Sequence, residues 1–378
     1  MLYFDSAATS LLRPRAVRHA VDTSLRKYAG YGRSGHKAAV QAAEAVYACR
    51  EEVAALFGLT APERVIFCQN ATHALNIALL GLPLKGSRIV ISGYEHNAVR
   101  RPLVARCERE ERTLSVAGSP LFDREGALRA FEHLLDAECA LCVCTMVSNV
   151  FGNILPVAEI GAICRERGIP FVIDAAQAAG CMAVDCKILN ADIVCMPGHK
   201  GLLGPTGTGI MLLCTDCLPQ PLLFGGTGGD SANLHQPEYL PDRFESGTPN
   251  LPGINGLCAG VRYIRKYGSR IWRRETKLVS ELKYALKNFP GVRLFDSEGE
   301  TCGNLFSFAV DGMQSEAVAE KLAARGVAVR AGLHCAPLAH ESAGTLADGT
   351  VRVSVCGENT EEEVTRFCRT LWAVLMRK

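Results

Sequence analysis

The stretches PFVIDAAQAAG (170–180) and MPGHKGLLGPTGTG (196–209) decide the fold of this chain. The first is an apolar run, typical of a buried strand, that ends at Asp174. The second starts at the end of another such run, DIVCMP (192–197), and continues into a glycine-rich loop that carries Lys200. Parallel sheets bind ligands at the carboxyl ends of their strands, so both residues are predicted to lie at a ligand-binding edge.

The sequence around these stretches alternates between short apolar runs and segments with helical periodicity. Short apolar strands separated by helices predict an α/β fold with a large, mostly parallel sheet that helices cover on both faces. The expected strands are 64–68, 88–92, 140–147 and 207–213, and the expected helices are 16–28, 38–57, 72–82, 98–110 and 157–168.

The final third of the chain has a different rhythm and predicts a smaller α+β domain over 254–378, opened by a helix over 254–288. The large domain then covers 16–253, and the N-terminal segment 1–15 is expected to pack with the small domain. Residues 217–253 carry no obvious helix or strand. A loop of this length is either functional or disordered.

The composition argues against several classes of protein. The 378 residues are 48% hydrophobic and 21% charged, with a formal net charge of +2. Without a long run of one sign, neither nucleic acid nor an anionic membrane is expected as a partner. No apolar run approaches the roughly 20 residues that span a bilayer, and MLYFDSAATS (1–10) lacks the pattern of a secretory signal.

The 17 cysteines are scattered and odd in number. A chain of this size needs no disulfide scaffold, so we interpret most of them as reduced thiols and expect a cytoplasmic protein. Cys214 and Cys217 form a lone C-x-x-C motif. A turn at a strand end is favoured there over a metal site, because no second pair follows at zinc spacing. No metal is expected.

Each polar residue at the predicted edge has a plain structural interpretation when it is taken alone. Asp174 could cap the next helix, Lys200 could bind a phosphate, and His96, after the strand at 88–92, could be a surface or core residue. Together they fit pyridoxal 5'-phosphate (PLP), which needs a lysine for its Schiff base and an acid beside its ring nitrogen. Thr72 opens a helix whose free amides suit a phosphate, although a simple N-cap stays open.

These residues lie in motifs that resemble the fold-type I PLP enzymes of the class V aminotransferase group. Within that group the chain is most similar to cysteine desulfurases and selenocysteine lyases. The resemblance covers residues 3 to 354 and is carried by YFDSAATS, QNATHALN, EHNA, SNVFGNILPV, VIDAAQAAG, GHKGLLGPTGTG, FESGTPN, RAGLHCAP and VRVS. It implies a homodimer whose active site is shared between two subunits.

The resemblance also implies a cofactor role for residues that match the family's motifs. They are Lys200 for the Schiff base, Asp174 for the pyridine nitrogen, Gln177 for the phenolic oxygen, His96 and Asn149 at the ring, Ala71, Thr72 and His199 for the phosphate, and Thr248 for the partner subunit's phosphate. Two positions depart from the family pattern. Pro197 and Ala71 replace hydroxyl residues, so two side-chain donors to the phosphate are missing.

Four residues are implied to contact the substrate: His36, Asn149, Arg330 and Arg352. Arg352 is expected to fork onto the substrate's α-carboxylate, which is the geometry that a guanidinium group provides. A P-loop nucleotide site is excluded, because Lys200 is followed by Gly201 and no G-x-x-x-x-G-K-[ST] motif is found.

Cys335 stands apart from the other cysteines because it lies in RAGLHCAPLAH (330–340), a loop rich in Gly, Pro and His. An unreactive loop cysteine is the plain interpretation. Positive charge from His334 and Arg330 would favour its thiolate, the form that attacks sulfur. The resemblance implies that Cys335 forms a persulfide. It also implies the short-loop subgroup of the family, which uses an accessory sulfur acceptor.

We therefore expect a cysteine desulfurase that converts L-cysteine to alanine, places the sulfur on Cys335 and passes it to a protein acceptor. His96 is expected to move protons as well as to stack on the ring. Several alternatives stay open: a selenocysteine lyase, another class V β-lyase or aminotransferase, or a non-catalytic sulfur-carrier or interaction protein with the same fold.

Overall fold

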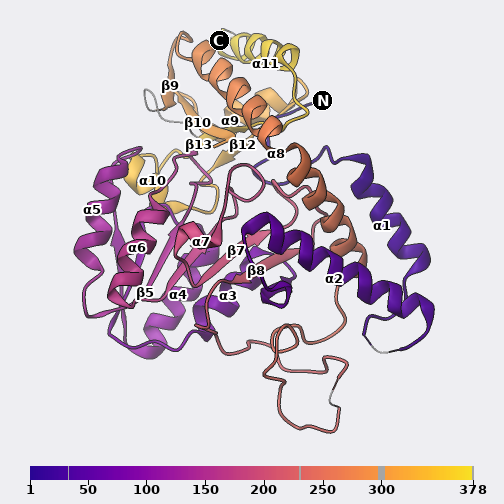
Figure 1. The fold of residues 1–378 in the computed structure, drawn as a ribbon. Coiled ribbons are helices and arrows are strands. Elements are labelled where there is room, and N and C mark those ends of the chain that lie inside the picture. Colours follow the sequence, from indigo (N-terminus) through magenta and orange to yellow (C-terminus); the bar gives the residue numbers. More distant parts are fainter. Residues whose placement is uncertain (33, 230, 297–302, 377–378) are drawn as a thin grey trace.

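A seven-stranded sheet forms the centre of the larger part of the molecule (Figure 1). The structure is a computed structural model that describes all residues except 33, 230, 297–302 and 377–378. All neighbouring strands are parallel except those paired with β8, which is antiparallel to both of its neighbours. In spatial order the strands are β2 (Val65–Cys68), β8 (Gly209–Leu213), β7 (Ile193–Pro197), β6 (Phe171–Asp174), β5 (Cys139–Thr145), β3 (Arg88–Ser92) and β4 (Thr113–Ala117).

Helices cover both faces of this sheet, which is why its central strands are buried along their whole length. On one face lie α3 (Ala71–Gly81) and α4 (Asn97–Glu110). On the other lie α2 (Lys37–Phe57), α5 (Arg124–Leu134), α6 (Val157–Arg167) and α7 (Cys186–Leu189). A 3-10 turn (Pro62–Arg64) precedes β2. The predicted α/β fold with a large, mostly parallel sheet is therefore confirmed.

The C-terminal part contains a second, antiparallel sheet with its own core. Its strands, in spatial order, are β12 (Arg330–Gly332), β13 (Thr350–Ser354), β10 (Leu305–Val310) and β9 (Val292–Phe295). Its helices are α9 (Ser315–Ala323), α10 (Pro337–Ala343) and α11 (Glu361–Leu375). The N-terminal strand β1 (Leu2–Tyr3) pairs with β11 (Val327–Ala328), so the start of the chain lies against this part.

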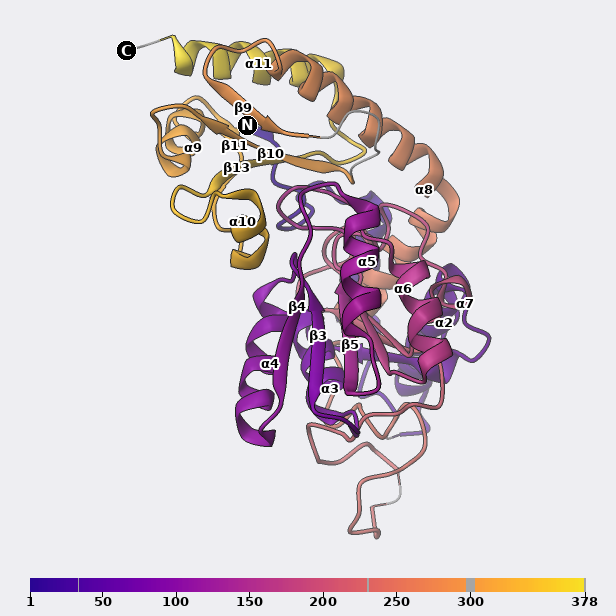
Figure 2. The same ribbon diagram turned by 90° about the vertical axis from the view of Figure 1, so that its left-hand side faces the viewer.

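Helix α8 (Leu251–Leu286) runs from the large sheet to the small one (Figures 1 and 2). Its first half places Leu257 and Val261 in the core of the large sheet. Helix α1 (Arg15–Lys27) packs against α8. Its second half places Leu278 and Leu282 in the core of the small sheet. The domain boundary between 253 and 254 stays a prediction.

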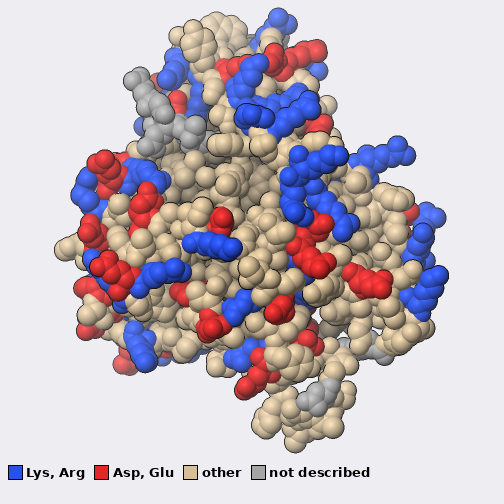
Figure 3. All heavy atoms as spheres, viewed as in Figure 1, with Lys and Arg blue, Asp and Glu red and all other residues tan. Residues whose placement is uncertain are grey.

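The surface carries both signs of charge in close mixture. On the face drawn in Figure 3, lysine and arginine side chains alternate with aspartate and glutamate. Charged side chains of the molecule also form ion pairs, such as Arg124 with Glu159 and Lys277 with Glu361. That face therefore presents no field of a single sign. Within the described residues, no helix combines the length and the apolarity that crossing a bilayer requires.

Candidate active site

The carboxyl ends of four neighbouring strands meet at one edge of the large sheet. Strands β3, β5, β6 and β7 are parallel neighbours, so the residues that follow them converge there. A cavity of about 190 Å³ opens at this edge beside the start of α3. Eight of the predicted site residues line it: Ala71, Thr72, His96, Asn149, Asp174, Gln177, His199 and Lys200.

Asp174 and Lys200 form the charged centre of the cavity. Asp174 is 3% exposed and accepts a hydrogen bond at Oδ1 from the Ala176 amide (2.9 Å). Burial raises the pKa of Asp174, while that hydrogen bond and the Lys200 charge lower it. Loss of solvation lowers the pKa of Lys200 to about 8, against the opposing effect of Asp174. A fraction of the Lys200 amine is therefore unprotonated near neutral pH and able to attack a carbonyl group.

The glycines around Lys200 allow its loop to pack against other backbone. A Cβ atom on Gly201 would lie 2.4 Å from the Ala179 carbonyl oxygen. A Cβ atom on Gly209 would lie 2.4 Å from the carbonyl carbon of Asn70, the N-cap of α3. The close approach of β8 to the start of α3 therefore depends on glycine at 209.

The start of α3 offers free backbone donors to the cavity. Asn70 accepts a hydrogen bond from the His73 amide (2.8 Å), which satisfies one of the four unpaired amides of the first turn. Ala71 and Thr72 both line the cavity, and their amides have no partner within the part of the chain that the structure describes. With the positive end of the helix dipole, these amides suit a phosphate group.

His96 ends the loop after β3 and caps α4. Its Nδ1 accepts a hydrogen bond from the Ala98 amide (3.0 Å), and this assigns the proton of the neutral ring to Nε2. Burial lowers the pKa of His96 to about 4, and the charges of Lys200 and Arg330 add to this effect. The ring is therefore neutral at physiological pH and presents an N–H donor.

The lowered pKa of His96 predicts a specific acid sensitivity. The unfolded chain binds this proton near pH 6.5 and the folded chain near pH 4, so the stability that His96 contributes is lost as the pH falls through that window. His96→Asn keeps a capping side chain but does not titrate. Relative to the wild type, the cofactor-free variant should gain about 2 kcal/mol in free energy of unfolding between pH 7 and pH 4.5.

Urea unfolding at the two pH values measures this difference. His133→Asn is the matched control, because His133 is exposed on α5 and should leave the pH dependence unchanged. If the free energy of unfolding of H96N falls with pH as steeply as that of the wild type, the lowered pKa of His96 is contradicted.

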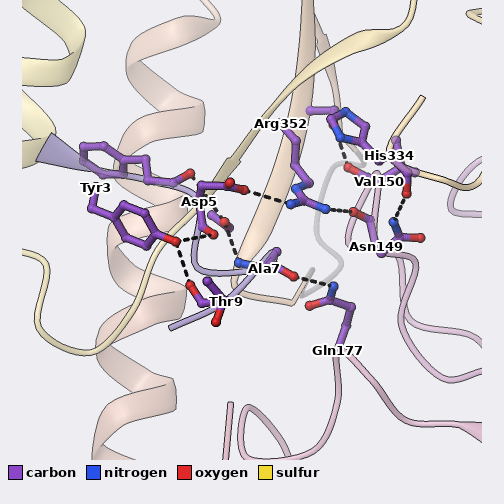
Figure 4. Close-up of polar contacts among 12 residues, drawn as sticks. Tyr3, Asp5, Ala7, Thr9, Asn149, Val150, Gln177, His334 and Arg352 are labelled. Atoms are coloured by element: carbon purple, nitrogen blue, oxygen red, sulfur yellow. Dashed lines mark hydrogen bonds and ion pairs between the residues drawn. The ribbon is translucent and has the colours of Figure 1, made fainter. Parts of the chain in front are cut away.

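Arg352 on β13 is a buried cation that reaches toward the cavity from the small sheet (Figure 4). It is 2% exposed, and it donates to Asp5 Oδ1 (2.9 Å) and to the Asn149 carbonyl oxygen (2.9 Å). Its Nε is buried without a partner. Burial lowers the pKa of Arg352, and Asp5 opposes that effect. The Nε–H donor of the guanidinium group is therefore without a partner among the described residues.

Two amide side chains at the cavity are engaged with backbone of other segments (Figure 4). Gln177 donates to the Ala7 carbonyl oxygen (3.1 Å), and Asn149 donates to the His334 carbonyl oxygen (2.7 Å). These contacts hold the N-terminal segment and the loop after β12 against the cavity. The predicted contacts of Gln177 and Asn149 with cofactor and substrate stay predictions.

Cys335 lies on an exposed turn and is not among the described residues that line the cavity. Its carbonyl oxygen accepts the amide of Asn97 (2.7 Å), the residue that follows His96. His334 and Cys335 have φ angles of 49° and 58°, a left-handed conformation that non-glycine residues seldom adopt. The thiol borders a hollow of about 580 Å³ over α4, lined also by Arg101. The turn thus presents a sulfur between the cavity and the surface.

One sequence interpretation is wrong: His334 does not supply positive charge beside Cys335. Its ring is 5% exposed and its Nε2 lies 3.1 Å from the Thr350 carbonyl oxygen. Burial, with the charge of Arg352, holds the pKa of His334 well below its usual value. The ring is neutral, and any positive field at Cys335 comes from arginines.

Three predicted residues are not among the described residues that line the cavity, although the charge of Arg330 still lowers the pKa of His96 and of Lys200. His36 is exposed and caps α2, accepting from the Ala39 amide (3.4 Å). Arg330 is exposed on β12, where it lies opposite Arg352. Thr248 is exposed and lines a different cavity of about 430 Å³.

The sequence interpretation missed two acidic residues that support the site. Asp5 pairs with Arg352. Glu95 is fully buried next to His96, and its Oε1 accepts the Thr145 amide (2.7 Å) and the Ser92 hydroxyl. Burial raises the pKa of Glu95 to about 8. Asp5 lies in the motif YFDSAATS and Glu95 in the motif EHNA. The position of each motif beside a strand was the only feature of the sequence that could have indicated a role for these two residues.

Comparison with known proteins agrees with this geometry. The profile of the family described as Aminotransferase class-V matches residues 2–367. The chain belongs to this family.

Relatives of this class V protein are named as cysteine desulfurases. A probable cysteine desulfurase of Xylella fastidiosa (strain 9a5c) is 34% identical over 99% of this chain and 91% of the relative. Another, from Pyrococcus abyssi (strain GE5 / Orsay), is 35% identical over 98% and 93%. The apo structure of a cysteine desulfurase from Thermococcus onnurineus NA1 has a TM-score of 0.91 and 33% identity, covering 99% of this chain and 94% of that one.

Membership of the class V family confirms the resemblance and the predicted fold. Enzymes of this family use PLP. Within the described residues, no group of three or more histidine, cysteine or acidic side chains is arranged to hold a metal ion.

Proposed function

We propose that this protein is a PLP-dependent cysteine desulfurase that removes sulfur from L-cysteine, releases alanine and carries the sulfur as a persulfide on Cys335. The observation that carries the proposal is the arrangement at one sheet edge. A poorly solvated amine, a buried carboxylate and a neutral imidazole line one cavity, and an exposed cysteine lies on a turn whose backbone bonds to the residue after that histidine.

The residues present fit PLP. The Lys200 amine forms no hydrogen bond or ion pair within the described part of the chain, so it is free for a Schiff base. The Ala71 and Thr72 amides would hold the phosphate, and His199, which contacts Thr9 Oγ1 (3.1 Å), would lie beside it. Asp174 would hold the ring nitrogen, and Gln177 the phenolic oxygen.

PLP supplies an electron sink that makes the α-proton of an attached amino acid acidic. The residues of the chain hold the substrate and move its protons. Lys200 takes the α-proton, because its lowered pKa leaves part of it unprotonated. Arg352 forks onto the α-carboxylate, with Asn149 beside it. Arg330, whose charge acts on His96 and Lys200, is a further substrate contact, and His36, which lies away from the cavity of its own chain, would contact the substrate from the partner subunit. The His96 ring presents Nε2–H to the substrate thiol.

Cys335 performs the sulfur transfer. Its thiolate attacks the substrate sulfur, so an S–S bond forms as the substrate's carbon–sulfur bond breaks. The electron pair of that bond passes to the carbon skeleton, which takes up protons and leaves as alanine. Cysteine and one enzyme thiol thus become alanine and one enzyme persulfide, with no external oxidant or reductant.

The test of the function is a product assay with purified protein, PLP and L-cysteine. A desulfurase forms alanine and a sulfide-releasable persulfide in equal amounts. A β-lyase would form pyruvate and ammonia instead, and either that result or a protein that refuses PLP would overturn the proposal. Selenocysteine in the same assay distinguishes a selenocysteine lyase, which would turn over selenocysteine but not cysteine.

Arg352 gives a prediction for substrate binding. Arg352→Lys keeps a positive charge but removes the planar fork, so the KM for cysteine should rise about 10-fold to 100-fold with a smaller change in kcat. Steady-state kinetics at saturating PLP measures both constants. Arg293→Lys, on the exposed side of β9 in the same sheet, is the matched control. An unchanged KM would mean that Arg352 only pairs with Asp5.

The site is completed by a second copy of the chain. Thr248 is exposed in the loop before α8 and faces no part of the Lys200 cavity. In a homodimer it would reach the phosphate in the partner subunit. The persulfide then passes to a protein acceptor at the exposed Cys335 rim. The free thiols throughout the described chain suit the reducing cytoplasm, where we place the protein.

A further inference from the structure

A second, much smaller cavity of about 30 Å³ lies behind the Lys200 loop, on the side of the N-terminal segment. Several segments that are separate in the sequence enclose it. They contribute Ser6, Gly201 after Lys200, Glu275 on α8, Asn304 before β10, and Gly357 after β13. The cavity therefore lies where the large sheet, the small sheet and the N-terminal segment meet.

Three buried oxygen atoms at this cavity lack a hydrogen-bond partner among the described residues: Ser6 Oγ, Glu275 Oε2 and Asn304 Oδ1. Their residues are only 6%, 4% and 7% exposed. The amide of Asn304 is already engaged, because it donates to the Val355 carbonyl oxygen (3.2 Å) and to Cys181 Sγ (3.5 Å). Buried oxygens are rarely left unpaired, so three of them at one cavity indicate a missing ligand.

The electrostatics indicate the charge of that ligand. Glu275 is buried, and the described residues that line the cavity include no lysine, arginine or histidine. Burial raises the pKa of Glu275 to about 8, and a hydrogen bond from the Gly357 amide, which favours the charged form, does not offset that effect. The other ionisable side chains at the cavity, Cys181, Cys356, Tyr263 and Glu358, are neutral or acidic. A buried carboxylate without a counter-charge is costly, so with a pKa of about 8 Glu275 holds a proton near neutral pH unless a cation replaces that proton.

Size and ligand type restrict the ligand further. A cavity of about 30 Å³ has room for one or two water-sized species, which excludes an organic cation. Calcium and magnesium favour several carboxylates or retained water molecules, whereas this cavity has one buried carboxylate and two neutral oxygens. Zinc prefers nitrogen and sulfur ligands, whereas the unpaired atoms at this cavity are oxygens.

We propose that this cavity binds one alkali-metal cation, sodium or potassium, through Glu275, Ser6 and Asn304. The ion would neutralise the carboxylate and join three segments. Ser10 in the N-terminal segment already donates to the Lys200 carbonyl oxygen (2.8 Å), and Gly357 lies shortly after Arg352 on β13. A bound cation would therefore fix the backbone that carries both residues. Binding of this cation does not depend on which reaction the Lys200 cavity catalyses.

The direct test is the melting temperature of the holoenzyme in chloride salts of equal ionic strength. Wild-type protein should melt about 2 °C or more higher in potassium or sodium chloride than in tetramethylammonium chloride, whose cation is too large for the cavity. Glu275→Gln should abolish this difference. Glu358→Gln, an exposed carboxylate at the same cavity, should retain it and is the matched control.

Crystals of the wild type grown with thallium(I), a potassium substitute with strong anomalous scattering, locate the ion without any variant. An anomalous peak between Glu275, Ser6 and Asn304 is expected. Equal melting temperatures in all three salts, or a cavity that holds only ordered water in the thallium crystals, would overturn the proposal. So would a cation effect of full size in E275Q, because the ion would then bind elsewhere.

Discussion

Replacing Cys335 by alanine should reduce persulfide formation from cysteine by about 100-fold or more while PLP binding stays unchanged. The reason is the position of the residue. Its backbone touches the cavity rim through Asn97, but its side chain is exposed and is absent from the walls of the Lys200 cavity. The thiol can therefore be removed without disturbing the groups that would hold the cofactor.

The measurement combines alanine formation with mass spectrometry of the protein after one turnover. Wild-type protein should carry one additional sulfur atom on the peptide that contains Cys335, and C335A should carry none. Cys217→Ala is the matched control, since Cys217 is a partly exposed thiol far from this cavity and should leave both readouts unchanged. Sulfide release by C335A at the wild-type rate would remove the persulfide role.

A glycine variant at position 335 tests whether the backbone conformation of the turn contributes to the loss of activity. Because His334 and Cys335 both adopt a left-handed conformation, Cys335→Gly should keep the turn at least as well as alanine does. If alanine and glycine variants lose activity equally, the loss comes from the missing sulfur and not from altered backbone.

Residues at the sheet edge could be predicted from the sequence because strand periodicity fixes their location. Asp174 ends an apolar run and Lys200 follows the next one, and neighbouring parallel strands end at the same edge. The same logic placed His96 after β3 and Thr72 at the start of α3. No knowledge of long-range contacts is needed for such positions, since the sheet brings them together.

Contacts made by loops could not be predicted in this way. Arg352 pairs with Asp5 and Gln177 with the Ala7 carbonyl oxygen, over separations of 347 and 170 positions. No periodicity links these positions, because the N-terminal segment has hardly any regular structure to set its path. The burial of His334 was missed for the same reason: a loop rich in glycine and proline reads as exposed.

Local elements were missed where their pattern was weak. Strand β4 lies at the sheet edge and is only partly buried, so TLSVA shows no clear apolar run. Helix α10 is only 7 residues long, but Pro337 at its start and left-handed Gly344 at its end are the usual signals of helix boundaries. Glu275 gave no signal, because one acidic residue in an amphipathic helix is normally exposed.

Replacing Lys200 by methionine should abolish the absorbance of lysine-linked PLP and reduce turnover to background, about 1,000-fold or more below the wild type. Methionine has a similar length but no amine, so the packing of the loop should be kept. Lys187→Met, at the start of α7, is the control and should leave colour and activity unchanged. A coloured, active K200M protein would end the assignment of Lys200 as the cofactor lysine.

The same substitution should stabilise the protein when no cofactor is bound. The pKa of Lys200 is lowered from 10.5 to about 8 in the folded chain, so the unfolded chain binds this proton more readily between those values. Stability rises with pH through that window, and below pH 8 the folded state carries the full cost of holding a poorly solvated ammonium group. Because Lys200 lines a cavity, we reduce the free-energy cost that corresponds to the full pKa shift to about 2 kcal/mol.

At pH 7, the free energy of unfolding of cofactor-free K200M, measured with urea, should exceed that of the wild type by this amount, and the gain should fade toward pH 10. A lysine kept for structure would show the opposite sign, because its loss would weaken the fold. A residue whose removal stabilises the protein and destroys its activity is one retained for chemistry.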